Sequence, residues 1–206
     1  MRRVLLQVAA LGMFGLCGLV VAAQDPTVAF PNNYRQVLDN ADVVVLRAHY
    51  GPHESENVIL TRPPTHTGAY RVSPGRKERH SVVNLTDKPS DYLRVELKKV
   101  PLGTLKHEFR GSAPEPLVQG MKVEFDDPVL RVERVVCDAG STCALAAESS
   151  PSVLIAFSPS ELVERRKAKE FPLDSSVLWL KAGEDASVRA MGNAPAHLLR
   201  IVLLEH

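Results

Sequence analysis

The stretch SPGRKERHSVVNLTD, residues 73–87, presents a histidine shortly after a Pro-Gly turn. This histidine is His80, and Asn84 follows it within the same stretch. A neutral imidazole is a common ligand of transition metals, so His80 is a candidate metal ligand. Further candidate donors precede it in the chain, namely His53, Glu54, Glu56 and His66. None of these has the alternate spacing that puts two imidazoles on one face of a strand.

A second stretch near the C-terminus, LKAGEDASVRAMGNAP, has a similar turn and a similar polar pattern, with Ala186 where the first has His80. His80 therefore has two interpretations. It is either a ligand with partners elsewhere, or a residue of a repeated unit whose ring is hydrogen-bonded or solvated. Because a first-row metal needs three or four converging donors, we predict no metal site. His53, His66 and His80 are the remaining candidate ligands.

Cys137 and Cys143 lie in the segment VVCDAGSTCAL. The Asp-Ala-Gly-Ser sequence between them is typical of a turn, which brings two strand ends within disulfide range. In an oxidising compartment this predicts a Cys137–Cys143 disulfide, with two buried thiols as the alternative. A Cys-x-x-Cys redox or zinc motif is absent from the sequence.

The N-terminal residues predict a targeting segment. Arg2 and Arg3 precede an apolar run, and small residues stand before Gln24. This pattern is typical of a signal peptide over residues 1–23, and a retained membrane anchor is the alternative. We expect a periplasmic or secreted protein that is not attached to a membrane after cleavage.

The composition excludes some partners and some chemistry. Lys and Arg number 25 and Asp and Glu number 24, so no net charge draws the chain to nucleic acid. The 15 prolines and 12 glycines suit short elements joined by turns. The sequence has no Gly-x-Ser-x-Gly, phosphate-loop or His-Glu-x-x-His motif, and we predict no catalytic residues.

The chain contains two copies of one sequence unit. Residues 42–53 match residues 129–140 at an offset of 87, and residues 80–97 match residues 186–203 at an offset of 106. The offsets differ by 19 residues, about the length of a β-hairpin, which the first copy lacks in its middle. The short apolar runs and frequent turn residues predict strands. We read residues 158–171 as a polar hairpin arm.

On these motifs the chain resembles the cupin superfamily, as two tandem units that make a bicupin. The resemblance rests on the strand and Gly-Pro turn, the Pro-Gly turn, His-x-x-x-Asn, and then D-x-P-x-x-x-L-R-V-E-L. It implies an all-β fold of two tandem double-stranded β-helix (jelly-roll) barrels, the first shortened. The expected organisation is a signal peptide 1–23, a first unit 24–99, a linker 100–121 and a second unit 122–206.

Cupins hold a metal ion inside the barrel with a His-x-His pair, a glutamate and a third histidine. By this resemblance the second unit has Ala146 and Glu148 at the paired positions and Ala186 at the third. Ala190 stands where the first unit has Asn84. One carboxylate does not hold a transition metal, so no cofactor is expected. The second barrel should instead have an apolar interior, with Ala146, Ile155, Ala186 and Val188.

Two functions remain open. The first is an exported, non-catalytic bicupin that binds a small molecule or contacts another protein. The second is a metal-dependent cupin enzyme, an oxygenase or isomerase, with an improvised site built from His53, His66 and His80. The missing ligand set favours the first. We expect the second unit to be the better-formed barrel, with Trp179 partly buried in it.

Overall fold

The computed structural model describes most of the chain after residue 24. The described residues are 25–56, 69–72, 82–100, 104–105, 107–114, 116–157, 162–166, 169–172, 177–190 and 193–204. The predicted signal peptide, His66 and His80 lie outside them. Within these ranges no helix has the length and apolar character needed to cross a membrane.

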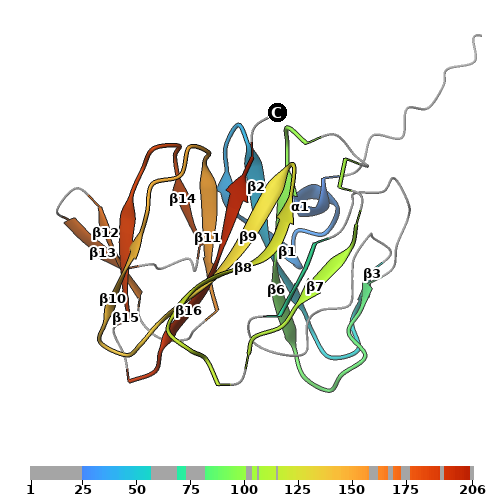
Figure 1. Ribbon diagram of the computed structural model, residues 1–206. Coiled ribbons are helices and arrows are strands. Elements are labelled where there is room, and N and C mark those ends of the chain that lie inside the picture. The colour runs from blue at the N-terminus through green and yellow to red at the C-terminus, as the bar shows by residue number, and fades with distance from the viewer. Residues whose placement is uncertain are drawn as a thin grey trace, which may run out of the picture.

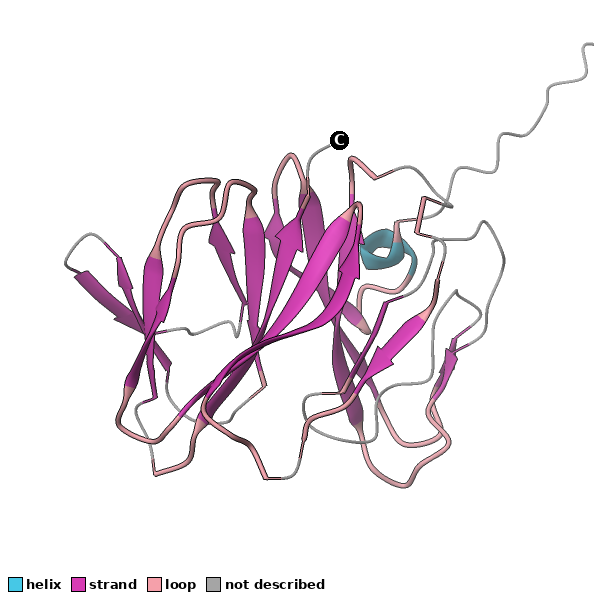
Figure 2. Cartoon of the chain, viewed as in Figure 1, coloured by secondary structure: helices cyan, strands magenta, loops and turns pink. Residues whose placement is uncertain are grey.

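Strands joined by turns dominate the molecule, and the predicted all-β class is confirmed (Figures 1 and 2). The N-terminal half has the elements α1 (Pro26–Ala29), β1 (Tyr34–Asp39), β2 (Val43–Tyr50), β3 (Ser55–Glu56), β4 (Tyr70–Val72), β5 (Val82–Val83), β6 (Ser90–Leu97) and β7 (Phe109–Gly111). The C-terminal half has β8 (Gly120–Asp127), β9 (Leu130–Cys137), β10 (Thr142–Leu145), β11 (Ser152–Ala156), β12 (Leu162–Arg166), β13 (Lys169–Pro172), β14 (Val177–Leu180), β15 (Ala186–Ala190) and β16 (Ala196–Leu203). We call α1 to β6 the first unit and β8 to β16 the second unit.

Two sheets of the second unit enclose an apolar core. One sheet has five strands in the order β14-β11-β16-β9-β8, and the other has four in the order β10-β15-β12-β13. Side chains from both sheets meet between them, and most are almost completely buried: Val135, Cys137, Leu145, Leu154, Leu180, Ala186, Val188, Ala190, Ala196 and Leu198. This is the barrel interior of the second unit, and the side chains that line it define the inner face of each strand.

The first unit has a three-stranded sheet, β1-β2-β6, and a two-stranded pair, β3-β5. The outer face of the three-stranded sheet packs against the outer face of the five-stranded sheet. Val43 and Val45 of β2 meet Val153 and Ile155 of β11 in one buried cluster. Burial of an aliphatic side chain of this size contributes about 1.5–3 kcal/mol, so this back-to-back contact joins the units firmly.

The strand registers follow the two sequence offsets. In the β2–β6 pair Val43 lies opposite Leu97, and in the β9–β16 pair Leu130 lies opposite Leu203. The same offsets relate the β3–β5 pair to the β10–β15 pair. They also relate β1–β2 to β8–β9, including a β-bulge at Val37 and at Glu124. The sequence repeat therefore corresponds to the same ladder of backbone hydrogen bonds in the two parts of the chain.

Two local differences from the sequence predictions stand out. The predicted linker, residues 100–121, contains β7, which pairs with β4, and the start of β8. The short helix α1 was not predicted; Asp25 caps it by accepting a hydrogen bond from the Thr27 N–H. In contrast, the polar hairpin arm predicted within residues 158–171 is confirmed where the structure describes it, by the antiparallel pairing of β12 with β13.

Trp179 and the two cysteines lie in the second unit as expected. Trp179, on β14, is partly buried where the five-stranded sheet packs against the three-stranded sheet of the first unit. This confirms that its side chain is partly buried. Cys137 ends β9 and Cys143 lies on β10, with 5.8 Å between their Cα atoms. Because β9 and β10 belong to different sheets, the Cys137–Cys143 disulfide joins the two sheets of the barrel at one corner. The sequence predicts a disulfide between two strand ends joined by a turn, and the structure adds that these ends belong to different sheets.

We predict that the protein carries this disulfide quantitatively when it is produced in an oxidising compartment. Intact mass after alkylation without reductant should show no modified cysteine, and prior reduction should expose two thiols. Replacing Cys137 and Cys143 together with serine should lower the free energy of unfolding by about 2 kcal/mol, because the closed loop is short. Two alkylated thiols in unreduced protein would contradict the prediction.

Candidate functional site

His53 lies in the turn between β2 and β3 and points away from the sheets' interior. Its φ is 54°, and Gly140 occupies the equivalent turn of the second unit with a φ of 73°. The His53 side chain is 65% exposed, and its Nε2 lies 2.8 Å from Oδ1 of Asp87. His53 thus lies in an exposed turn beside a solvated carboxylate, and this position does not direct its ring toward a metal site inside a barrel. The other two histidine candidates are not among the described residues.

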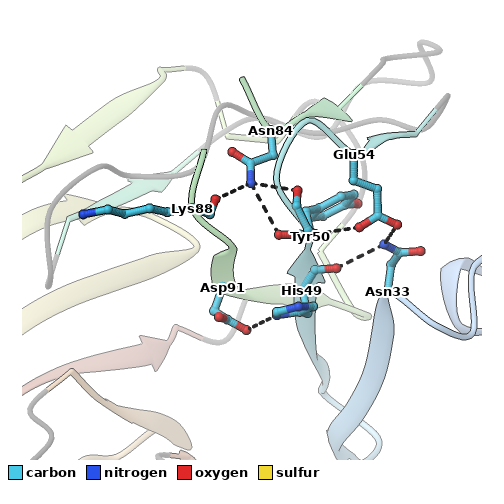
Figure 3. Close-up of polar contacts among 8 residues, drawn as sticks. Asn33, His49, Tyr50, Glu54, Asn84, Lys88 and Asp91 are labelled. Atoms are coloured by element: carbon cyan, nitrogen blue, oxygen red, sulfur yellow. Dashed lines mark hydrogen bonds and ion pairs between the residues drawn. The ribbon is translucent and has the colours of Figure 1, made fainter. Parts of the chain in front are cut away.

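Asn84 is a structural residue that ties two turns together (Figure 3). It is buried, and its side-chain amide donates to the carbonyl oxygens of Gly51, at 2.9 Å, and Lys88, at 2.7 Å. Its Oδ1 accepts from the backbone N–H and the hydroxyl of Thr86. The asparagine of the His-x-x-x-Asn motif is therefore occupied in holding the β2–β3 turn against the segment before β6.

Glu54, another candidate donor, is also occupied. Its carboxylate accepts from the Asn33 side chain at 2.8 Å and from the Gly51 N–H at 2.6 Å (Figure 3). These hydrogen bonds hold the pKa of Glu54 below its ordinary value. Glu54 thus closes the same turn that Asn84 supports.

Three tyrosines fill the inner face of the β1-β2-β6 sheet. The hydroxyl of Tyr34 lies 2.7 Å from that of Tyr50 and 3.2 Å from that of Tyr92. The rings of Tyr50 and Tyr92 are stacked with their centroids 6.0 Å apart. Burial, followed by the hydrogen bond with Tyr34, raises the pKa of Tyr92 above its ordinary value. Neutral phenols of this kind do not provide the anionic donors that a metal site needs.

The inner face of the second unit carries a buried ionic cluster that sequence reasoning missed. We call Arg131, Glu133, Glu148 and Arg200 the inner ionic cluster. Arg131 Nε donates to Glu133 at 2.8 Å, and its NH2 group lies 2.8 Å from Glu148. Arg200 is 1% exposed; it donates to the Ser152 hydroxyl at 3.1 Å and to the Ala146 carbonyl oxygen at 2.9 Å.

Arg200 lies between the two carboxylates of this cluster. Its NH1 is 4.0 Å from Glu133 and 3.8 Å from Glu148. Burial lowers the pKa of Arg200, and the two carboxylates oppose this effect. Burial alone would also lower the pKa of Arg131, but Glu148 and Glu133 outweigh it and raise that pKa. The cluster thus pairs two guanidinium groups with two carboxylates.

These residues do not fit the metal ion that the cupin resemblance implies. Glu148 is the one usual ligand expected to survive, and it is bound by Arg131 and lies near Arg200. Ala186 and Ala190 contribute methyl groups to the apolar core. A divalent cation would have to replace two guanidinium groups and would find no imidazole among these positions. The donor set of the second barrel is that of an internal salt-bridge network.

The predicted apolar interior of the second unit was partly wrong. Ala186 and Val188 line the core as expected. Ala146 is exposed and offers its carbonyl oxygen to Arg200, and Ile155 lies on the outer face against the first unit. Ser152 and Leu154 are the inward residues of β11 because side chains alternate along a strand.

A second polar cluster lies on the outer face of the second unit, where the first unit covers it. Arg134 binds the Glu124 carboxylate through two hydrogen bonds, of 2.6 and 2.9 Å, and also contacts Nε2 of His197. The ring of Tyr70 covers the Arg134 guanidinium, whose central carbon lies 5.6 Å from the ring centroid. Burial would raise the pKa of Glu124, but the hydrogen bonds from Arg134 hold it below its ordinary value.

Solved structures similar to this chain are β-barrel proteins. A variant of salicylate 1,2-dioxygenase from Pseudoaminobacter salicylatoxidans, in complex with gentisate, is 13% identical with a TM-score of 0.51; the match covers 78% of this chain and 68% of that one. A cupin domain of a transcriptional regulator from Enterobacter cloacae is 13% identical with a TM-score of 0.38, covering 42% and 97%. A predicted oxalate decarboxylase from Thermotoga maritima is 18% identical with a TM-score of 0.36, covering 41% and 79%. No family model and no curated protein sequence matches the chain.

The inner ionic cluster should be essential for stability. Glu133→Leu copies the residue of the first unit, Leu46, and leaves Arg200 with Glu148 alone. We expect a loss of about 3 kcal/mol in the free energy of unfolding, because breaking a buried pair leaves a charge uncompensated. Glu148→Gln, at a partly exposed position, should cost about 1 kcal/mol. Urea titrations of both variants measure the difference, and equal losses would contradict this ranking.

Stability should fall as the pH falls through the titration of His197. Burial, with the Arg134 guanidinium adding to it, lowers the pKa of His197 from 6.5 to about 4. The unfolded chain therefore binds a proton that the folded chain does not, between these two values. The stability that this neutral ring contributes is complete above pH 6.5 and is lost toward pH 4, by on the order of 1–3 kcal/mol.

Urea titrations between these pH values test the effect. His197→Gln should flatten the slope of stability against pH. An unchanged slope in His197→Gln would show that other groups cause the pH dependence.

Proposed function

We propose that this chain, which has the β-barrel fold of the cupins, is an exported two-unit protein that acts by binding and not by metal chemistry. The observation that carries the proposal is the inner ionic cluster. Where the resemblance expects metal ligands, Arg131 and Arg200 neutralise Glu133 and Glu148. The guanidinium groups occupy oxygens of both carboxylates, while Glu133 Oε2 has no hydrogen-bond partner among the described residues.

The first unit supports the same proposal. The tyrosines of its three-stranded sheet pack against one another and share their hydroxyl hydrogen bonds. Among the described residues, no three histidine, cysteine or acidic side chains converge on one point. The histidine alternative, with His53, His66 and His80, gains no support from His53, which lies in an exposed turn.

Export is supported by two features of the chain. The apolar segment before Gln24 has the form of a signal peptide. Cys137 and Cys143 lie at disulfide distance, and such bonds persist in oxidising compartments. A barrel whose interior is closed by its own side chains then leaves the outer surface as the place where other molecules bind.

Metal analysis of protein purified from the exported fraction tests the proposal. We expect a background content of manganese, iron and zinc, and a melting temperature unchanged by a chelator or by added metal. His80→Gln should change neither quantity. About one metal equivalent per chain that disappears in His80→Gln would overturn the proposal in favour of a metal-dependent enzyme.

A further inference from the structure

The strand β10, which carries Cys143, lies at the edge of the four-stranded sheet of the second unit. Among the described strands it pairs with β15 alone, over the residues Thr142–Leu145. The side chain of Leu145 is buried in the core between the two sheets. The Cys137–Cys143 disulfide adds a covalent bond to the end of β9 in the other sheet. One short ladder, one buried leucine and one disulfide therefore hold β10 in place.

The chain that leaves β10 supplies partners to the inner ionic cluster. The carbonyl oxygen of Ala146 accepts a hydrogen bond of 2.9 Å from Arg200. The carboxylate of Glu148 lies 2.8 Å from Arg131 and 3.8 Å from Arg200. We call residues 142–148 the β10 segment. Because Cys143 belongs to this short segment, a displacement of its sulfur is carried directly to the groups that surround Arg200.

The two cysteines can also be accommodated as thiols within the fold. The Sγ atom of Cys137 lies 3.9 Å from the carbonyl oxygen of Val188, and that of Cys143 lies 3.7 Å from the carbonyl oxygen of Val136. A thiol is a weak hydrogen-bond donor, so each S–H group would have an acceptor close by. Cys143 is only partly buried, which leaves its sulfur open to attack by a thiol reagent.

Reduction would nevertheless disturb this corner of the barrel. Two thiols need more room than a disulfide, and a close-packed interior responds to added volume by moving its parts. The β10 segment is the part that can move, since β10 is an edge strand whereas β9 is paired on both sides, with β8 and β16.

We propose that the Cys137–Cys143 disulfide is a redox-sensitive switch that controls the inner ionic cluster. With the disulfide formed, the β10 segment holds Glu148 and the Ala146 carbonyl oxygen against Arg200. After reduction the segment moves away, and Arg200 keeps Glu133 and Ser152 as neighbours. This inference goes beyond the proposed binding function and does not depend on it.

The reductant in this step is a dithiol. Its two sulfurs form a disulfide with each other, and the two electrons and two protons that it gives up convert Cys137 and Cys143 to thiols. Arg200 is 1% exposed, so its charge is then less well compensated inside the protein. The second unit should therefore open locally around the β10 segment at a lower cost than complete unfolding.

Hydrogen exchange followed by NMR on the full mature chain, with and without dithiothreitol, tests the proposal. The Ala190 N–H donates to the Ser141 carbonyl oxygen, in the loop that the disulfide closes. The Gly183 N–H donates to the Glu148 carbonyl oxygen, at the far end of the β10 segment. We expect both N–H groups to exchange about tenfold or more faster after reduction, because both acceptors belong to the part that opens. The N–H groups of the β9–β16 ladder should keep their rates.

Faster exchange at Ala190 with an unchanged rate at Gly183 would overturn the proposal, because the disturbance would then stop at the loop. Unchanged exchange at both positions would overturn it as well. So would equal acceleration in the β9–β16 ladder, since the protein would then unfold as a whole. Alkylation of a parallel sample reports the thiols, and a disulfide that the dithiol does not reduce in the folded chain would also contradict the switch.

Glu148→Gln provides an independent test of the link to the cluster. In the disulfide form this change should lower the folding equilibrium constant about fivefold. In the reduced form the loss should be less than about twofold, because the segment has already left Arg200. The matched control is Glu124→Gln, since Glu124 binds Arg134 on the outer face of the same unit. Its loss should be equal in both redox forms. An equal loss for Glu148→Gln in both forms would show that the cluster does not respond to the disulfide.

Discussion

The contact between the outer faces of the two central sheets is the constraint on which the rest of the molecule depends. Val43, Val45, Val153 and Ile155 form its buried centre. Side chains alternate between the two faces of a strand. Because these four residues point outward, the residues next to them on each strand point inward. The inner faces must then be filled separately in each unit, and the two units fill them by different means. One uses stacked tyrosines and the other uses an apolar core with a salt-bridge network.

The last long strand of each unit shows how far the units have diverged on one framework. Arg94 of β6 and Arg200 of β16 occupy equivalent inward positions. Arg94 is paired with Glu96 on its own strand, whereas Arg200 lies between Glu133 and Glu148 from other segments. Arg200 is almost completely buried, so its partners determine stability more strongly than those of Arg94.

Much of the architecture could be predicted from the sequence, because both copies of the repeat contain short apolar runs that favour strands. The matched apolar runs predicted β2, β6, β9 and β16, and the turn between Cys137 and Cys143 predicted their proximity. The inner ionic cluster could not be predicted, since Arg131, Glu133 and Arg200 look like exposed charges until the register shows them on one inward face. The tyrosine cluster was missed for the same reason: Tyr34, Tyr50 and Tyr92 are far apart in sequence and meet only through strand pairing.

The β-bulge that both units share has an evolutionary consequence. A bulged residue stands outside the regular ladder, so its side chain can be exchanged without altering any backbone pairing. Val37 and Glu124 occupy this position in the two units, with the flanking registers preserved. After a duplication, one point change here is enough to give one unit a carboxylate beside its arginine and the other unit an apolar side chain. The bulge is thus a place where the two halves of a repeated protein can acquire different roles while keeping one fold.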